Sequence, residues 1–297
     1  MSSSRRPIVV GPLRVPLLLV ALLALARALH AADASEAIAR GDAAWEKRAD
    51  GAHGGHAAKG PIAACVADYE EAWKADPTNL DAGWKLLRAL WYQGEYSTAN
   101  NDERQKVFAR GKEVSEQVWA QVAKKVGAQK LASAKAADRA AALRPLPEAP
   151  ALLLFSAAHW GLWGDAFGKL AAARQGVATK VRDWAETLIV LDERYDAGAG
   201  HRVLGRLHSE APHIPLVTGW IDHDLSITEL EKAVAIGPEE PDNRLHLAKA
   251  ILEYKPAAKA RALQLLREIV AAQPRAEFPV EDSKTAEQAA AVIKASS

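Results

Sequence analysis

The sequence predicts an all-α solenoid built from helical hairpins, on three observations. From Ala34 onward, helix-forming Ala, Leu, Glu, Lys and Arg dominate, and alternation with a period of two residues is almost absent. Pro and Gly fall mostly between the periodic stretches, where helices stop. A small–large–small spacing of side chains also recurs along the chain, which is typical of repeated helix pairs. We expect about five helix pairs and a C-terminal capping helix.

The periodic stretches between these stops define the helices that we expect. They cover residues 34–48, 61–75, 79–93, 102–125, 128–143, 150–169, 177–191, 199–210, 222–236, 242–254, 258–272 and 283–295. Between the first two, Asp50–Pro61 (DGAHGGHAAKGP) predicts a flexible loop. Its His53 and His56 have no acid or thiol near enough in sequence to complete the four ligands of a structural metal site. We therefore expect a solvated loop and no metal.

The recurring spacing identifies the residues that should pack between helices. Cys65, Tyr69 and Ala72 are followed by Pro77, and the same spacing returns in two later segments. Those segments contain Ser226, Leu230, Ala233 and Pro238, then Ala262, Leu266, Ile269 and Pro274. Separations of four and three residues put each triplet on one helix face. The partner helices carry a large residue followed by a very small one, in Leu204–Gly205 and Leu247–Ala248.

The N-terminus has the three zones of a secretory signal. Arg5 and Arg6 precede an apolar run from Val15 to Ala26, which small residues follow at 26–28. The alternative is a membrane anchor. Twelve residues at ~1.5 Å each span about 18 Å, short of the ~30 Å hydrocarbon layer. We therefore expect residues 1–30 to be a signal peptide.

Cleavage of that signal would leave a mature chain beginning between Leu29 and Asp33. Residues 31–297 would then form one helical repeat domain. We expect this domain to be periplasmic or otherwise exported, soluble, and without a transmembrane span.

Composition excludes several classes of function. The 38 Lys and Arg balance 37 Asp and Glu, which gives no electrostatic footprint for nucleic acid. Cys65 is the only cysteine, so we expect a buried structural thiol and no internal disulfide. No phosphate loop, dinucleotide fingerprint or Gly-x-Ser-x-Gly motif occurs. We expect no cofactor and no catalysis; an enzyme with a site assembled across helices is the third alternative.

The packing pattern resembles the tetratricopeptide repeat, most closely over residues 199–274 and 36–93. Longer strings resemble the TatT family, helical periplasmic partners of certain tripartite ATP-independent (TRAP) transporter binding proteins. These strings are Leu191–Tyr195, Gly198–His208, Ala211–Pro212 and the set Gly41, Asp42, Trp45 and Arg48. The resemblance implies a periplasmic solute-binding protein as partner. In one departure from the repeat pattern, His208 replaces the usual aromatic residue.

Nine Trp residues stand beside few Phe and Tyr. Most should fill the core, yet indoles with polar N–H groups also line grooves. Trp160 and Trp163 lie among glycines that leave room for a ligand, and we expect them to wall an apolar cavity together with Trp91. His201 or Arg202 would bind a carboxylate head, although structural hydrogen bonding is the alternative role for both.

Two functions therefore follow from the sequence. The first is a periplasmic helical repeat protein that binds a transporter solute-binding protein and a small hydrophobic ligand. The alternative is a general tetratricopeptide scaffold for the assembly of envelope proteins.

Overall fold

The computed structural model describes residues 32–214 and 218–296, which form α-helices joined by turns, with no regular strand in these ranges. A helix over residues 32–45 is followed by α2 (Lys59–Ala75), α3 (Leu80–Tyr96), α4 (Asn101–Val126), α5 (Ala128–Leu131), α6 (Ala136–Leu143), α7 (Ala149–Phe167), α8 (Lys169–Arg174), α9 (Val177–Leu191), α10 (Ala199–Glu210), α11 (His223–Ile236), α12 (Pro241–Tyr254), α13 (Lys259–Ala271) and α14 (Pro279–Ser296). Short 3-10 turns cover Tyr195–Ala197 and Pro256–Ala258. The predicted signal peptide lies outside the described residues.

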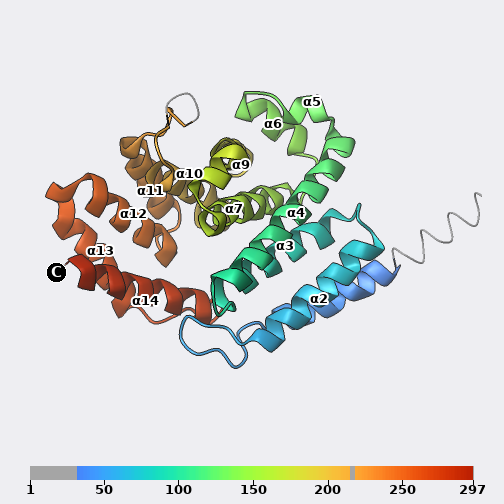
Figure 1. Ribbon diagram of the computed structural model, residues 1–297, viewed down its shortest axis with the longest axis horizontal. Helices are drawn as coiled ribbons and strands as arrows, with labels where there is room; N and C mark the ends of the chain where they lie inside the picture. The colour runs from blue at the N-terminus through green and yellow to red at the C-terminus, as the bar shows by residue number, and fades with distance from the viewer. Residues whose placement is uncertain (1–31, 215–217, 297) are drawn as a thin grey trace, which may run out of the picture.

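The predicted all-α helical repeat fold is confirmed. Each long helix packs against the next along the chain, from α2 on α3 to α13 on α14, and α4 packs directly on α7 past the short α5 and α6 (Figure 1). Helix starts follow local chemistry: Asn79 and Asn100 accept hydrogen bonds from the first turns of α3 and α4. None of the helices in the described ranges is long and apolar enough to cross a membrane.

Two segments differ from the expected helices. The helix expected over 128–143 breaks between α5 and α6, where Ser133 Oγ donates to Asp138 and accepts from the Lys135 backbone N–H. Such local side-chain bonds compete with helix continuation. The short α8 was not expected, and it follows Gly168, whose φ of 94° favours glycine.

The ten residues that we selected for repeat packing all lie buried: Cys65, Tyr69, Ala72, Leu204, Gly205, Leu230, Ala233, Leu247, Ala248 and Leu266. Burial raises the pKa of the Cys65 thiol to about 12, which keeps it protonated.

Glycine is needed where α10 meets α11. A Cβ on Gly205 would lie 2.6 Å from Leu230 Cγ and 3.1 Å from the Ser226 carbonyl oxygen. The Ser226 hydroxyl donates to the Gly205 carbonyl at 2.7 Å across the same contact.

The first and last parts of the described chain meet. Arg48 donates to the Glu281 carboxylate on α14, with N–O distances of 3.2 and 3.3 Å, and to the carbonyl of Glu277. Its guanidinium also lies against the rings of Trp45 and Tyr92, 4.6 and 5.6 Å from their centroids. The helices therefore close on themselves, with α14 beside the loop that precedes α2 (Figure 1).

The segment predicted as a flexible loop is part of this closure. The backbone N–H of Gly55 donates to Glu287 at 2.9 Å, and a Cβ at Gly55 would meet Lys284 Cα at 2.6 Å. Gly51 and Gly54 take φ values of 71° and 55°, which bend the loop toward α14. The glycines thus permit close packing, and α2 begins at Lys59, two residues before the expected loop end.

Replacing Gly205 with Ala should lower the free energy of unfolding by about 1–3 kcal/mol, because the added Cβ overpacks the contact with Leu230. Gly161→Ala is the matched control. Its Cβ would meet nothing within 4 Å, and a helical Ala is favoured over Gly by up to about 1 kcal/mol. Urea unfolding of both variants measures the difference. Equal midpoints would place Gly205 outside a tight contact.

Replacing Arg48 with Ala should cost about 3–5 kcal/mol, because Glu281 would keep a desolvated carboxylate without its partner. The two side chains are only 9% and 13% exposed. Arg40→Ala is the control, since Arg40 is 41% exposed and pairs with surface carboxylates. Hydrogen exchange of residues 46–58 should accelerate in the first variant alone. Similar stabilities for the two variants would contradict a stabilising closure.

Candidate binding site

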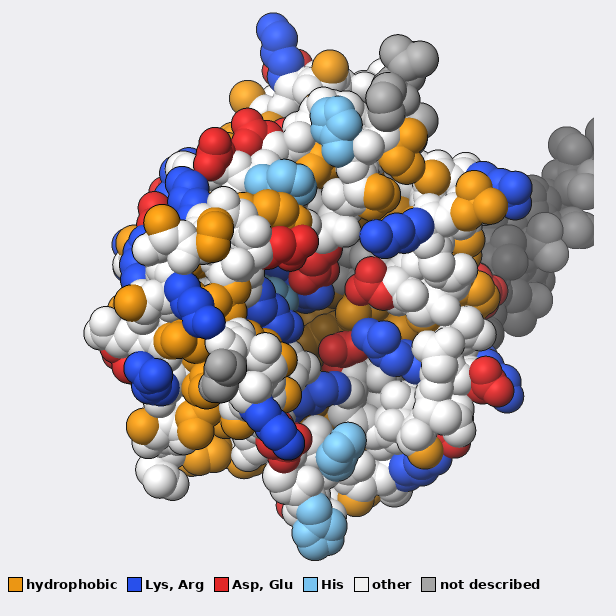
Figure 2. Space-filling view, turned by 60° about the vertical axis from the view of Figure 1, so that its left-hand side comes forward, with side chains coloured by type: hydrophobic (Ala, Val, Ile, Leu, Met, Phe, Trp, Pro, Cys, Tyr) orange, Lys and Arg blue, Asp and Glu red, His pale blue; other side chains and the backbone are white. Residues whose placement is uncertain are grey.

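Charged side chains from six helices lie close enough together to shift one another's pKa values. Figure 2 shows one hollow in the surface with both Lys/Arg and Asp/Glu side chains on its wall. The charged cluster consists of Glu95, Arg104, Asp165, Arg202, Arg206, Glu210, Glu240, Asp242, His246 and Lys284. Its members come from α3, α4, α7, α10, α12 and α14, together with the turn before α12. Segments far apart in sequence therefore bring these charged groups together. We call the concave surface that they form the central hollow.

Members of the cluster are surrounded by protein and yet reach solvent. The side chains of Arg206, Glu210 and Asp242 are 34%, 45% and 38% exposed. Burial is nevertheless the largest single influence on the pKa of each. On a convex surface an exposed group has few protein atoms around it. Groups that are exposed to solvent and also surrounded by protein therefore lie on a concave wall. The cluster is thus accessible to a partner.

Cations and anions of the cluster form ion pairs with one another. Arg104 pairs with Glu95 at 2.7 Å, and Arg206 pairs with Glu210 at 3.3 Å. Burial alone would raise the pKa of Glu210, but Arg206 and His246 hold it below its ordinary value. Glu210 is therefore ionised at neutral pH, and the hollow carries both signs of charge.

Asp165 differs from its neighbours. Burial and the charge of Glu210 raise its pKa, although Arg206 opposes them. Within the described chain, Asp165 makes no hydrogen bond or ion pair, and its side chain is exposed. Its exposed carboxyl group can therefore be reached by a cation of a partner.

The three indoles selected from the sequence pack between helices. Trp160 is 2% exposed and meets Trp184 edge to face at 6.1 Å. Trp91 of α3 packs on Phe155. Trp163 stacks on Phe167 of its own helix at 4.9 Å and packs against the cluster that contains Val177 and Val181 of α9. Together they fill the contacts of α7 with its neighbours. Neither of the two pockets described below is lined by any of the three indoles that we selected.

His201 and Arg202 hold the structure together. His201 Nδ1 lies 2.5 Å from Glu229, and its Nε2 lies 3.2 Å from Glu193. Arg202 donates to Asp196 at 2.7 Å and to Asn243 at 3.0 Å. Arg202 also belongs to the central hollow, whereas His201 joins α10 to α11.

Sequence reasoning missed an indole pair that does line a pocket. Trp119 of α4 and Trp184 of α9 stack with centroids 5.7 Å apart and planes 20° apart. The pocket beside them, which we call the indole pocket, has a volume of about 190 Å³. The two residues are distant in sequence, so no spacing could have linked them.

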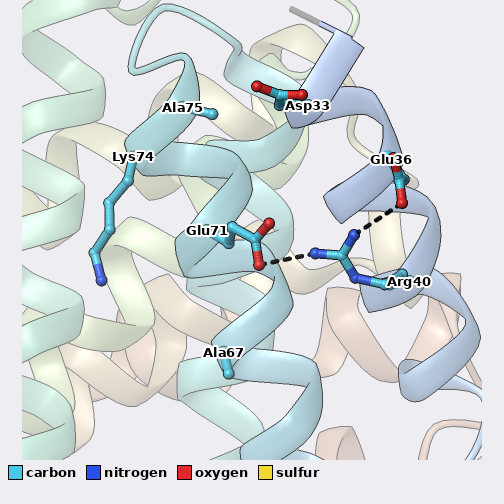
Figure 3. Close-up of a pocket in the computed structure, with 7 residues that line it drawn as sticks. All are labelled: Asp33, Glu36, Arg40, Ala67, Glu71, Lys74 and Ala75. Atoms are coloured by element: carbon cyan, nitrogen blue, oxygen red, sulfur yellow. Dashed lines mark hydrogen bonds and ion pairs between the residues drawn. The ribbon is translucent and has the colours of Figure 1, made fainter. Parts of the chain in front are cut away.

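A second pocket lies near the start of the described chain. Figure 3 shows Arg40 between Glu36 and Glu71, beside Asp33, Lys74 and two alanines. The ion pair from Arg40 to Glu71 is 2.8 Å long, and the Glu71 side chain is 62% exposed. Exposed pairs of this kind contribute little, and the pocket resembles an ordinary ionic surface.

Within the described ranges, no group of three or more His, Cys, Asp and Glu side chains is arranged to hold a metal ion. His53 and His56 face each other across a backbone bridge with N–O distances of 2.9 and 3.2 Å.

No protein-family model matches the chain, and no curated protein is similar to it. Its function is therefore inferred from its own geometry.

The wild-type protein should have a higher free energy of unfolding than His201→Gln, and the difference between the two should depend on pH. Burial would lower the pKa of His201, but Glu229 and Glu193 raise it overall. Because the pKa of His201 is higher in the folded state, its protonation stabilises the fold. This contribution is complete at pH values below the unfolded-state pKa of about 6.5, and it is lost as the pH rises through the folded-state pKa. Urea unfolding between pH 5.5 and 9 should show the advantage shrinking. In a Glu229→Gln background most of this dependence should vanish; an unchanged dependence would contradict the pairing.

Proposed function

We propose that this chain is a helical repeat binding protein that holds a charged segment of a partner protein in its central hollow. The observation that carries the proposal is the presence of both charge signs in one cluster built by six helices. A cluster of a single sign would suit a simple ion, whereas a cluster of mixed sign suits a polypeptide segment with its own pattern of Lys, Arg, Asp and Glu.

Exchange of ion pairs gives such a site its specificity. Arg104 and Arg206 already form ion pairs with carboxylates of this chain. A partner therefore gains binding free energy only where its own carboxylates form ion pairs at least as good as these. Asp165 offers a carboxyl group with which a Lys or Arg side chain of the partner would pair. A segment with the wrong order of charges would leave desolvated charges unpaired, which costs several kcal/mol.

The resemblance to the TatT family suggests the identity of the partner, a periplasmic TRAP-transporter solute-binding protein. Residues of the resembling string also have clear roles here: Asp42 accepts from Tyr69 and Lys85, and Arg48 closes the ring. We propose a periplasmic location and binding without catalysis on the same basis. A general envelope scaffold is the rival function, and it would bind unrelated partners equally well.

Calorimetric titration of the purified protein against TRAP solute-binding proteins and unrelated periplasmic proteins tests the proposal. Binding should be selective and should weaken with salt. Arg206→Ala should weaken it at least tenfold, about 1.4 kcal/mol, because the hollow loses a partly exposed cation. Arg261→Ala is the matched control, since Arg261 pairs with Glu231 outside the charged cluster at 2.7 Å and both are exposed.

Equal affinity of the two variants would exclude the central hollow as the binding site. Equal binding of all the proteins tested would favour the scaffold function.

A further inference from the structure

The indole pocket lies where α4, α5, α6, α7 and α9 approach one another. It is lined by Trp119, Leu131, Arg139, Leu143, Leu153, Lys180, Asp183, Trp184 and Thr187. None of these residues belongs to the central hollow. The pocket is therefore a separate feature of the molecule with its own chemistry.

Apolar groups form most of its wall. The stacked rings of Trp119 and Trp184 stand beside Leu143 and Leu153, which are both buried. The Trp119 indole N–H already donates to Ser156 at 2.8 Å, so Trp119 offers its ring surface to the pocket. An apolar cavity of about 150 Å³ is known to hold one benzene molecule. A volume of about 190 Å³ thus suits a single aromatic ring with a short side arm.

Most polar groups at the rim are already bonded within the chain. Arg139 donates to Thr187 at 2.7 Å and to the carbonyls of Ser133 and Asp183 at 2.8 and 3.0 Å. The carboxylate of Asp183 accepts from Arg182 at 3.2 Å. These residues shape the pocket and have little capacity left for a ligand.

Lys180 is the exception among the charged groups that line the pocket. Its ammonium donates to the Gln175 carbonyl at 3.3 Å and lies 3.7 Å from the ring centroid of Trp160. Within the described residues it makes no ion pair, although the more distant charge of Glu116 acts on it. A second cation, Lys112, approaches the same ring at 4.3 Å, but Lys112 pairs with Glu116 at 2.8 Å. Lys112 does not line the pocket, so Lys180 is the cation on the rim with which an anion could pair.

We propose that the indole pocket binds a small aromatic carboxylate, with its ring against Trp119 and Trp184 and its carboxylate on Lys180. The ring would fill the apolar end, and the acid would supply the missing partner of the ammonium. This site goes beyond the binding of a partner protein in the central hollow and does not depend on it.

Isothermal titration with 3-phenylpropionate, and with 3-phenylpropanamide as its uncharged counterpart, tests the proposal. Tryptophan emission excited at 295 nm gives a second readout, because neither probe absorbs there. The acid should bind at least tenfold more tightly than the amide. In Lys180→Met this preference should disappear, while Lys169→Met, another exposed lysine on the neighbouring α8, should keep it.

Leu131→Trp supplies a second test, because it fills the pocket from its partly buried rim and should abolish binding of both probes at an unchanged melting midpoint. The proposal is overturned if acid and amide bind alike, if neither binds at millimolar concentration, or if the two lysine variants behave identically. Arg206→Ala should bind the acid like wild type, so a failure at the central hollow is distinguishable from a failure here.

Discussion

Arg48 joins the two ends of the described chain, and the shape of the molecule depends on that contact. Its guanidinium bonds to Glu281 across a separation of 233 residues and packs on aromatic rings of the first helices. A buried arginine is costly unless every donor finds an acceptor and its plane is covered. Here Nε and Nη2 of Arg48 donate to α14 and to the segment just before it, and the ring of Trp45 covers the guanidinium plane, so groups from opposite ends of the chain act together. Neither end alone could hold the side chain in this state.

Closure also determines the electrostatics of the interior. Lys284 on α14 reaches the carbonyl of Glu95 at the end of α3 and lies 5.0 Å from the Tyr96 ring centroid. Burial lowers the pKa of Lys284, which is possible only because α14 brings it against the first helices. The concave wall is thus completed by the last helix, and the charges of six helices act on a shared volume.

The sequence predicted local features well and distant ones poorly. Helix boundaries followed from periodicity and stops, because these are properties of neighbouring residues, and every residue of the small–large–small pattern is buried. The loop over 50–61 was recognised from its composition, but no local pattern could show that its glycines pack closely on α14. No local pattern distinguishes Glu210 and Asp242 from other helix carboxylates, and only the packing of distant helices brings them into one cluster. Likewise, composition revealed many indoles but could not show that Trp119 meets Trp184.

The meeting of first and last elements changes how this kind of molecule comes apart. An open solenoid is a one-dimensional array in which each repeat contacts only its neighbours. Its end repeats therefore unfold first, and unfolding proceeds toward the middle. A ring has no end at which fraying begins. Melting any one helix pair here also removes a neighbour from the pair on its other side, including across the contact of Arg48 with Glu281. Opening a terminal helix pair of this closed arrangement therefore costs more than opening the end pair of an open solenoid, because contacts are lost on both of its sides.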